Sequence, residues 1–224
     1  VKSVVKLLDA GPVFKDDIVA LAFWMRDRWN SPLGLSLEAF FPGRLADQCA
    51  FADAFQEPDS IAAVEVPALS GFAAEAALRI GKAIGRGFPS AFLLETPPGL
   101  AREKIFTALC ARARASGGQA LLMVPDLNVM PPFAETLTQA FGAQSLAFWH
   151  SRLTPRQRKE TWTGVLSGRK RVVVGTRSAA FLPFKNLALA IVDSEQENIY
   201  KQEEAEPHFH ARDLLLKRSR AHGT

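Results

Sequence analysis

The sequence has no long apolar run and very little cysteine. A membrane-spanning helix needs roughly 20 consecutive apolar residues, and no stretch of the 224 residues approaches that length. The N-terminal VKSVVKLLDAGPVF lacks the apolar core and the cleavage site of a signal peptide. The two cysteines, Cys49 and Cys110, form no CxxC pattern, so neither a zinc site nor a disulfide framework is expected. These absences favour a cytoplasmic protein that does not contact membranes.

The chain also lacks an initiator methionine, and it stops at HGT directly after a basic helical pattern. Both features predict a fragment cut at its two ends. Its 48% hydrophobic content is that of an ordinary globular protein, and its length suits one domain with a small appendage.

Charge is distributed unevenly along a chain whose net charge is only +4. From His150 to the end there are 14 Lys and Arg against 8 Asp and Glu, so the rest of the chain is slightly acidic. A basic half is compatible with a polyanionic partner such as nucleic acid, although basic solvated faces are common.

The hydrophobic pattern divides the chain into three parts. Residues 1–44 read as a small unit with an amphipathic helix over 16–29, because apolar side chains recur there at helical spacing. Residues 45–68 have weak periodicity and read as a linker or a reduced remnant of something larger. From 69 to 224, helical patterns (about 71–85, 102–116, 132–141 and 155–166) alternate with apolar runs (91–94, 120–124, 146–149, 171–175 and 187–193).

This alternation predicts an α/β fold, with a mostly parallel sheet covered by helices on both faces. Such sheets bind ligands at the carboxyl ends of their strands, and the segments that follow the last three runs carry distinctive residues. They are His150-Ser151-Arg152, the string GTRSAAFLPF over 175–184, DSEQ over 193–196, YKQE over 200–203 and HARD over 210–213. In this order, the strings resemble those of the PriA-type replication-restart helicases, which are superfamily 2 DNA helicases.

The resemblance covers about nine-tenths of the chain and implies a RecA-like helicase lobe 1 over 69–224. Residues 1–44 would then be the C-terminal half of the family's domain that binds the 3′ end of DNA, and 45–68 a reduced winged-helix region. The second helicase lobe and the zinc module would lie beyond Thr224. A bacterial, cytoplasmic and nucleoid-associated location is also implied.

The resemblance places the ATP-binding loop after the run 91–94, where most of the family's residues are replaced. A P-loop needs flanking glycines, a Lys for the phosphates and a hydroxyl for Mg²⁺. Only the central Gly99 is kept; Arg102 stands for the Lys and Glu103 for the Thr. Thr96 and Ala101 replace the flanking glycines, Pro97 and Pro98 remove two backbone donors, and Glu95 adds negative charge. Tight binding of ATP and Mg²⁺ is therefore not expected.

The second nucleotide element has changed as well. Where the family has Asp-Glu-Glu-His, this chain has Asp193, Ser194, Glu195 and Gln196. Asp193 remains suited to Mg²⁺, whereas a hydroxyl at 194 is no general base near neutral pH. Ala73 replaces the adenine-reading Gln. We therefore expect no intact catalytic residues at this site, and only a degenerate set formed by Gly99, Arg102, Glu103 and Asp193.

Residues on the expected DNA side are better preserved. By resemblance, contacts to DNA fall to His150, Ser151, Thr176, Arg177, Ser178, Tyr200, Lys201 and Arg212. Arg177 as a surface residue and Ser178 as a helix N-cap is the alternative. Tyr200 begins the family's aromatic loop, which stacks on single-stranded DNA, but Glu206, Pro207 and His208 depart from it. A metal site at His208 and His210 is not expected, and Trp149 and Trp162 suit core packing.

Three functions remain open from the sequence. The first is a pseudo-helicase that binds forked or junction DNA for primosome assembly, together with primosome proteins and single-strand-binding protein. The second is an active ATP-dependent 3′→5′ helicase in which Arg102 takes the role of the Lys. The third is a scaffold that binds no DNA.

Overall fold

A computed structural model describes residues 16–41, 64, 66–84, 86, 88–97, 100 and 102–222. The first helices are α1 (Asp16–Trp29), α2 (Leu33–Glu38), α3 (Gly71–Gly81) and α4 (Arg102–Ala115). Strands and helices then alternate as β1 (Gln119–Met123), α5 (Met130–Ser145), β2 (Leu146–Trp149), α6 (Pro155–Ser167), β3 (Val172–Gly175) and β4 (Leu187–Val192). Two 3-10 helices, η3 (Arg177–Phe181) and η4 (Asn198–Tyr200), and a small β5 (Lys201–Gln202) and β6 (Phe209–His210) pair precede α7 (Ala211–His222).

The four longer strands form one parallel sheet in the order β2-β3-β1-β4. Every residue of the central strand β1 is buried, as is every residue of β3. Continuous apolar strands of this kind are typical of parallel sheets covered on both faces. The sheet confirms the predicted α/β fold.

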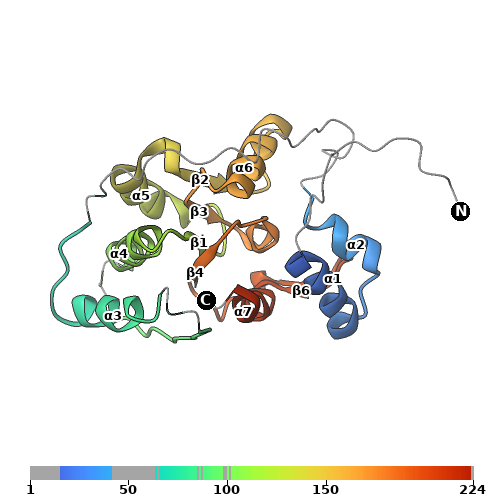
Figure 1. Cartoon of the computed structure of the whole chain (residues 1–224), viewed down its shortest axis with the longest axis horizontal. Helices are drawn as coiled ribbons and strands as arrows, with labels where there is room; N and C mark the ends of the chain where they lie inside the picture. The colour runs from blue at the N-terminus through green and yellow to red at the C-terminus, as the bar shows by residue number, and fades with distance from the viewer. Residues whose placement is uncertain are drawn as a thin grey trace, which may run out of the picture.

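Helices cover both faces of the sheet (Figure 1). One core cluster joins α3, α4 and α5 to one face, and the other joins α1, α6 and α7 to the opposite face. The layers agree with a RecA-like lobe. Both described N-terminal helices belong to the second layer, because Phe40 just after α2 accepts a hydrogen bond from Trp162 Nε1 at 3.0 Å. The predicted boundaries at 44 and 68 stay predictions; residues 42–63 lie outside the described part.

Local signals explain the helix ends that the sequence predicted well. Thr154 caps α6 in a reciprocal capping box with Gln157, and Pro155 occupies the first turn. Gly168 ends the same helix at φ 82°, a left-handed conformation that favours glycine. Among the described residues, no helix is long and apolar enough to cross a membrane.

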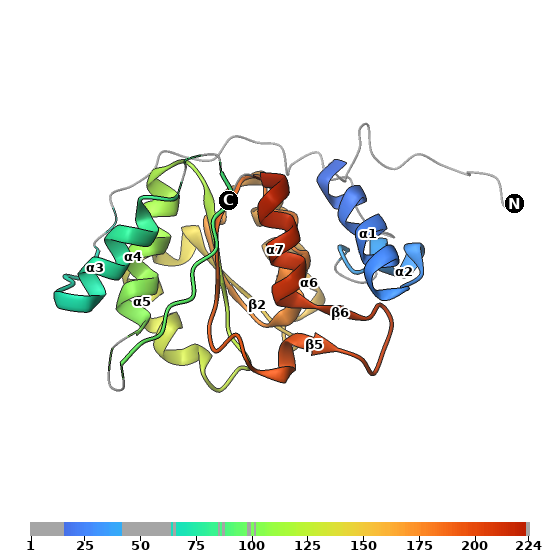
Figure 2. The same cartoon turned by 90° about the horizontal axis from the view of Figure 1, so that it is seen from below.

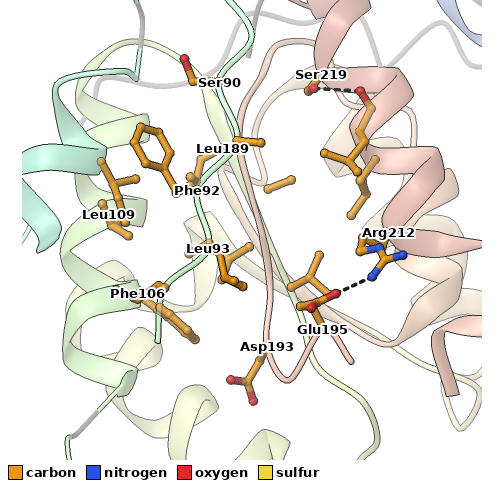
Figure 3. A pocket seen from close by; sticks show the side chains of 18 of the residues that line it. Ser90, Phe92, Leu93, Phe106, Leu109, Leu189, Asp193, Glu195, Arg212 and Ser219 are labelled. Carbon is orange, nitrogen blue, oxygen red and sulfur yellow. Dashed lines mark hydrogen bonds and ion pairs between the residues drawn. The ribbon is translucent and has the colours of Figure 1, made fainter. Parts of the chain in front are cut away.

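The strand predicted at 91–94 is wrong, because the structure has irregular backbone there. Phe92 is 46% exposed and Leu93 is 74% exposed, so the run is not buried in a sheet. It lies alongside β4, across a pocket from it (Figure 3). A four-residue apolar run becomes a strand only when its backbone reaches a partner edge, and prolines at 89 and 97 border this one closely.

Candidate functional site

The carboxyl ends of the strands bring the predicted site segments together. The backbone amide of Asp193 donates to Met123 O at 2.9 Å, and Thr176 N donates to Trp149 O at 3.0 Å. Ser194 then turns the chain with φ 52°, an uncommon conformation for a residue with a side chain. The turn fixes Asp193 at the end of the edge strand β4.

Asp193 is the most buried carboxylate of this site, with only 3% of its side chain exposed. Its Oδ1 accepts a hydrogen bond at 2.6 Å from Arg102 Nη1, which comes from the first residue of α4. Burial raises the pKa of Asp193, while the Arg102 guanidinium and hydrogen bonds from Ser194 oppose the rise. The carboxylate predicted to hold Mg²⁺ is therefore already paired with a cation of the chain itself.

Tyr200 lies beneath this pair and is completely buried. Its hydroxyl donates to the carbonyl oxygens of Asp193 at 2.6 Å and Met123 at 3.3 Å. Burial and the nearby carboxylates raise the pKa of Tyr200. The expectation that Tyr200 stacks on a base is thus corrected, since its ring has no exposed face.

A second ion pair lies beside the first. Arg212 Nη1 donates to Glu195 Oε2 at 2.6 Å (Figure 3). Arg212 Nε also lies 3.3 Å from Asp213 Oδ1. These hydrogen bonds to carboxylates raise the pKa of Arg212. Lys201 is paired with Glu203. Two of the cations predicted to face DNA are therefore paired with carboxylates of the chain.

The Arg177 side chain is hydrogen-bonded to the backbone of a neighbouring segment. Its Nη1 donates to the carbonyl oxygens of Ile199 at 3.2 Å and Lys201 at 3.0 Å. The exposed Ser178 is not an N-cap, because Thr176 precedes η3 in that position and its side chain makes no capping bond. The N-cap part of that alternative is wrong, whereas the predicted phosphate contacts of Thr176, Arg177 and Ser178 stay predictions.

Much of the string that carries the resemblance is core. Ala179, Ala180 and Phe181 are buried, and the Phe181 ring meets Phe40 and Phe209 edge-on at centroid distances of 5.1 and 4.7 Å. Trp149 and Trp162 are buried too, as predicted. The string thus has a packing role that is independent of any ligand.

The other predicted residues lie on surrounding loops. Burial and the charges of Arg152 and Arg158 lower the pKa of His150, whose buried Nδ1 has no hydrogen-bond partner among the described residues. Ser151 is exposed, and its carbonyl accepts a bond from Arg158. His208 pairs with Glu206 at 3.7 Å, and the described residues contain no metal-ligand cluster of three or more.

A pocket of about 940 Å³ extends along β4 from this polar end (Figure 3). Apolar side chains of α4, β4 and α7, together with others from the end of α3 and from the segment 91–94, line most of it, and Arg102, Asp193 and Glu195 lie at one end. Sequence reasoning found these residues singly but missed their pairing, because the partners lie 91 and 17 positions apart. Of the predicted loop, Gly99 lies outside the described residues, as do Pro98 and Ala101, while Glu103 is half-buried in the first turn of α4.

The layered parallel sheet, with an acidic residue directly after its edge strand, is consistent with a RecA-like lobe. The resemblance to PriA is confirmed by comparison with known proteins. The chain is 35% identical over 131 residues to the replication restart protein PriA of Bacillus subtilis, which covers 58% of the chain and 16% of that relative. To PriA of Helicobacter pylori strain 26695 it is 38% identical over 127 residues, 57% of the chain and 20% of the relative.

The similarity reaches across nearly the whole chain in one relative. PriA of Treponema pallidum is 28% identical over 217 residues, which is 97% of the chain and 32% of that protein. The chain thus spans less than a third of the length of these three relatives. No family model matches the chain.

Proposed function

We propose that the chain is part of a replication-restart protein that binds forked or junction DNA without an ATP cycle. Similarity to PriA supports the restart role, and the Arg102–Asp193 ion pair supports the loss of the cycle. Residues 1–44 would contribute to binding a 3′ DNA end, and 69–224 form the platform. By resemblance, the further partners are primosome proteins and single-strand-binding protein, in a nucleoid-associated location.

The ion pair is the observation that carries the proposal. A Mg²⁺ ion at a nucleotide site needs carboxylate oxygens that are open to it. The Asp193 carboxylate is buried and bonded to a guanidinium at 2.6 Å, so a metal ion at Oδ1 would have to displace Arg102. Two like charges 4 Å apart repel by about 4 kcal/mol at an effective dielectric of 20.

The other carboxylate at the site, that of Glu195, is also bonded to a cation and is therefore not available to assist hydrolysis. Glu195 is bonded to Arg212 at 2.6 Å, and Ser194 carries no carboxylate. With both arginines paired, the end of the pocket has no excess positive charge from these four residues. A triphosphate brought there would meet neither an open metal ligand nor a cation without a carboxylate partner.

An active ATP-dependent 3′→5′ helicase is the second candidate. It is favoured by the pocket of about 940 Å³ that reaches both Arg102 and Asp193. In that case Arg102 would exchange Asp193 for a phosphate when ATP and Mg²⁺ bind.

Three measurements on the whole chain test the proposal. Calorimetry with ATP and Mg²⁺ should give no binding heat, and turnover should be absent with forked DNA present. Fluorescence anisotropy should show binding to a forked DNA that weakens with added salt. ATP turnover that Asp193→Asn abolishes would establish the active helicase instead. Absence of DNA binding at low salt would instead support the third function, a scaffold that binds no DNA.

A further inference from the structure

A group of basic side chains gathers at the opposite end of the sheet from the site described above. Arg169, Lys170 and Arg171 lead into β3, Lys185 precedes β4, and Arg114 lies in the last turn of α4. We name these five residues the amino-edge cluster, because parallel strands begin there. From this cluster we infer a second surface for the phosphate backbone of nucleic acid, remote from the loops at the carboxyl ends of the strands.

Several contacts hold the members of the cluster together. Buried Gln119 joins two of its segments, since its Nε2 donates to Lys170 O at 2.7 Å and its Oε1 accepts from Lys185 N at 2.7 Å. Arg171 Nη1 donates to Gly117 O at 3.0 Å, three residues beyond Arg114. A Cβ placed on Gly168 would lie 3.4 Å from Lys185 Cδ. Segments from three connections therefore meet on one edge.

The sequence segments that carry the cluster are poor in carboxylates. The segments 104–125, 136–159 and 161–192 contain no Asp or Glu. Lys170 Nζ donates to the backbone carbonyls of Ala143 and Leu146, and Arg171 Nη1 donates to that of Gly117. Burial is the main cause that lowers the pKa of Lys170 and that of Arg114. Glu160 raises the pKa of Lys170, whereas Arg169 lowers it further, and Arg171 further lowers the pKa of Arg114. Neighbouring positive charges of the cluster therefore repel one another.

Helix ends explain only part of this clustering. The C-termini of α4, α5 and α6 point to this edge, and each carries a partial charge of roughly −0.5. Three such ends amount to about −1.5 against five cations. Arg114 is 7% exposed, and its Nε has no hydrogen-bond partner in the described part of the chain. The positive charge of the cluster therefore exceeds the partial negative charge of these helix C-termini.

The chemistry of the cluster favours a polyphosphate over a protein partner. Protein interfaces rely on a few buried aromatic or aliphatic anchors, and none of the five members is aromatic or aliphatic. Binding to DNA or RNA backbone needs cations spaced along a surface and no base contacts. A sequence-independent contact to a DNA arm fits these side chains. This choice of partner rests on the proposed function.

The test replaces the exposed Arg169 and Lys185 by alanine in the whole chain. The matched control, Lys82→Ala with Lys217→Ala, removes the same charge from exposed positions elsewhere. Anisotropy with a plain DNA duplex across a salt series should show binding weakened at least tenfold for the Arg169/Lys185 variant. Its slope of log K against log salt should fall by about 1 to 2, and the control should match the parent chain.

Other outcomes separate the possible errors. Equal weakening in both double variants would reduce the effect to net charge and overturn the inference. The parent chain could instead bind an acidic peptide more tightly than duplex DNA, and the Arg169/Lys185 variant could lose that peptide binding. This result would identify a protein partner and would also overturn the inference. If the parent chain bound no DNA at all, the proposed function itself would be contradicted. If it bound DNA equally well with and without Arg169 and Lys185, only the second surface would be contradicted. The single variants give the same comparison if the double variant does not fold.

Discussion

Arg102 begins helix α4, Asp193 directly follows the edge strand β4, and their side chains meet at 2.6 Å although 91 positions separate them. The helix and the strand are thereby joined at the end of the sheet where ligands of such folds bind. The pair leaves the buried Asp193 carboxylate bonded to a cation of the chain itself.

Replacing Arg102 by alanine should lower the free energy of unfolding by about 1–3 kcal/mol. Breaking a fully buried pair costs about 3–5 kcal/mol, because the remaining charge is left unpaired. Arg102 is 40% exposed, so solvent reduces this cost. Urea unfolding measures the change, and Arg102→Lys should recover much of the loss. An unchanged free energy in the alanine variant would show that the pair contributes nothing.

The same pair predicts a dependence of stability on pH. Because burial raises the pKa of Asp193, the folded chain holds that proton more tightly than the unfolded chain does. This contribution is present at low pH and is lost as the pH rises from about 4. The loss should be steeper in Arg102→Ala, where the opposing cation is gone. Stability measured against pH for the parent chain and for Arg102→Ala gives two curves. When Asp193→Asn is added to both chains, the difference in slope between the curves should disappear.

Alkaline titration should report on Tyr200, because the chain has one tyrosine. Its raised pKa means that the folded state disfavours the tyrosinate. Stability from this group is complete below the ordinary pKa of about 10 and falls above it. Tyrosinate absorbance should therefore appear together with unfolding and not before. Tyrosinate formed while circular dichroism stayed native would contradict the buried position.

Loss of the Tyr200 hydroxyl should weaken the fold at neutral pH. Tyr200→Phe keeps the ring but leaves the carbonyls of Asp193 and Met123 without this donor. We expect a loss of about 1–2 kcal/mol in the free energy of unfolding. Denaturant titration measures it, and the phenylalanine variant should also lose the alkaline absorbance change.

Gln119 should be among the least replaceable side chains. Its amide donates to Val165 O at 3.0 Å and Lys170 O at 2.7 Å, and it accepts from Lys185 N at 2.7 Å and Asn186 N at 3.1 Å. Gln119→Leu leaves four backbone groups without this partner, which should cost about 3–5 kcal/mol. Thermal and urea unfolding measure the loss, and a loss below about 1 kcal/mol would mean that water replaces the amide.

Gly175 should not accept even a methyl group. A Cβ there would lie 2.5 Å from Ala179 Cβ and 2.9 Å from Trp149 O, so the strand or η3 would have to move. Gly175→Ala should destabilise the fold by about 1–3 kcal/mol. Gly34→Ala is the control, because nothing lies within 4 Å of its Cβ position, and it should be neutral or gain up to about 1 kcal/mol.

Periodicity predicted most of the fold because strong local patterns and tertiary packing agree. The helix predicted at 16–29 matches α1, and the run 146–149 matches β2. The run 91–94 failed, since four apolar residues do not say whether a partner edge is within reach. The site residues were predicted by type. Their pairing, and the burial of Tyr200, depend on contacts between distant segments that no local pattern encodes.

Helix α1 packs against α7, and its apolar side chains Ile18, Leu21, Ala22 and Met25 share a core cluster with Leu214 and Leu215 (Figures 1 and 2). On the ribosome these two helices are made far apart in time. About 180 residues separate them, which at roughly 5–20 residues per second is a delay of about 10–40 s. Throughout that interval the apolar stripe of α1 lacks its partner on α7, and the helix already available to cover part of it is its neighbour α2.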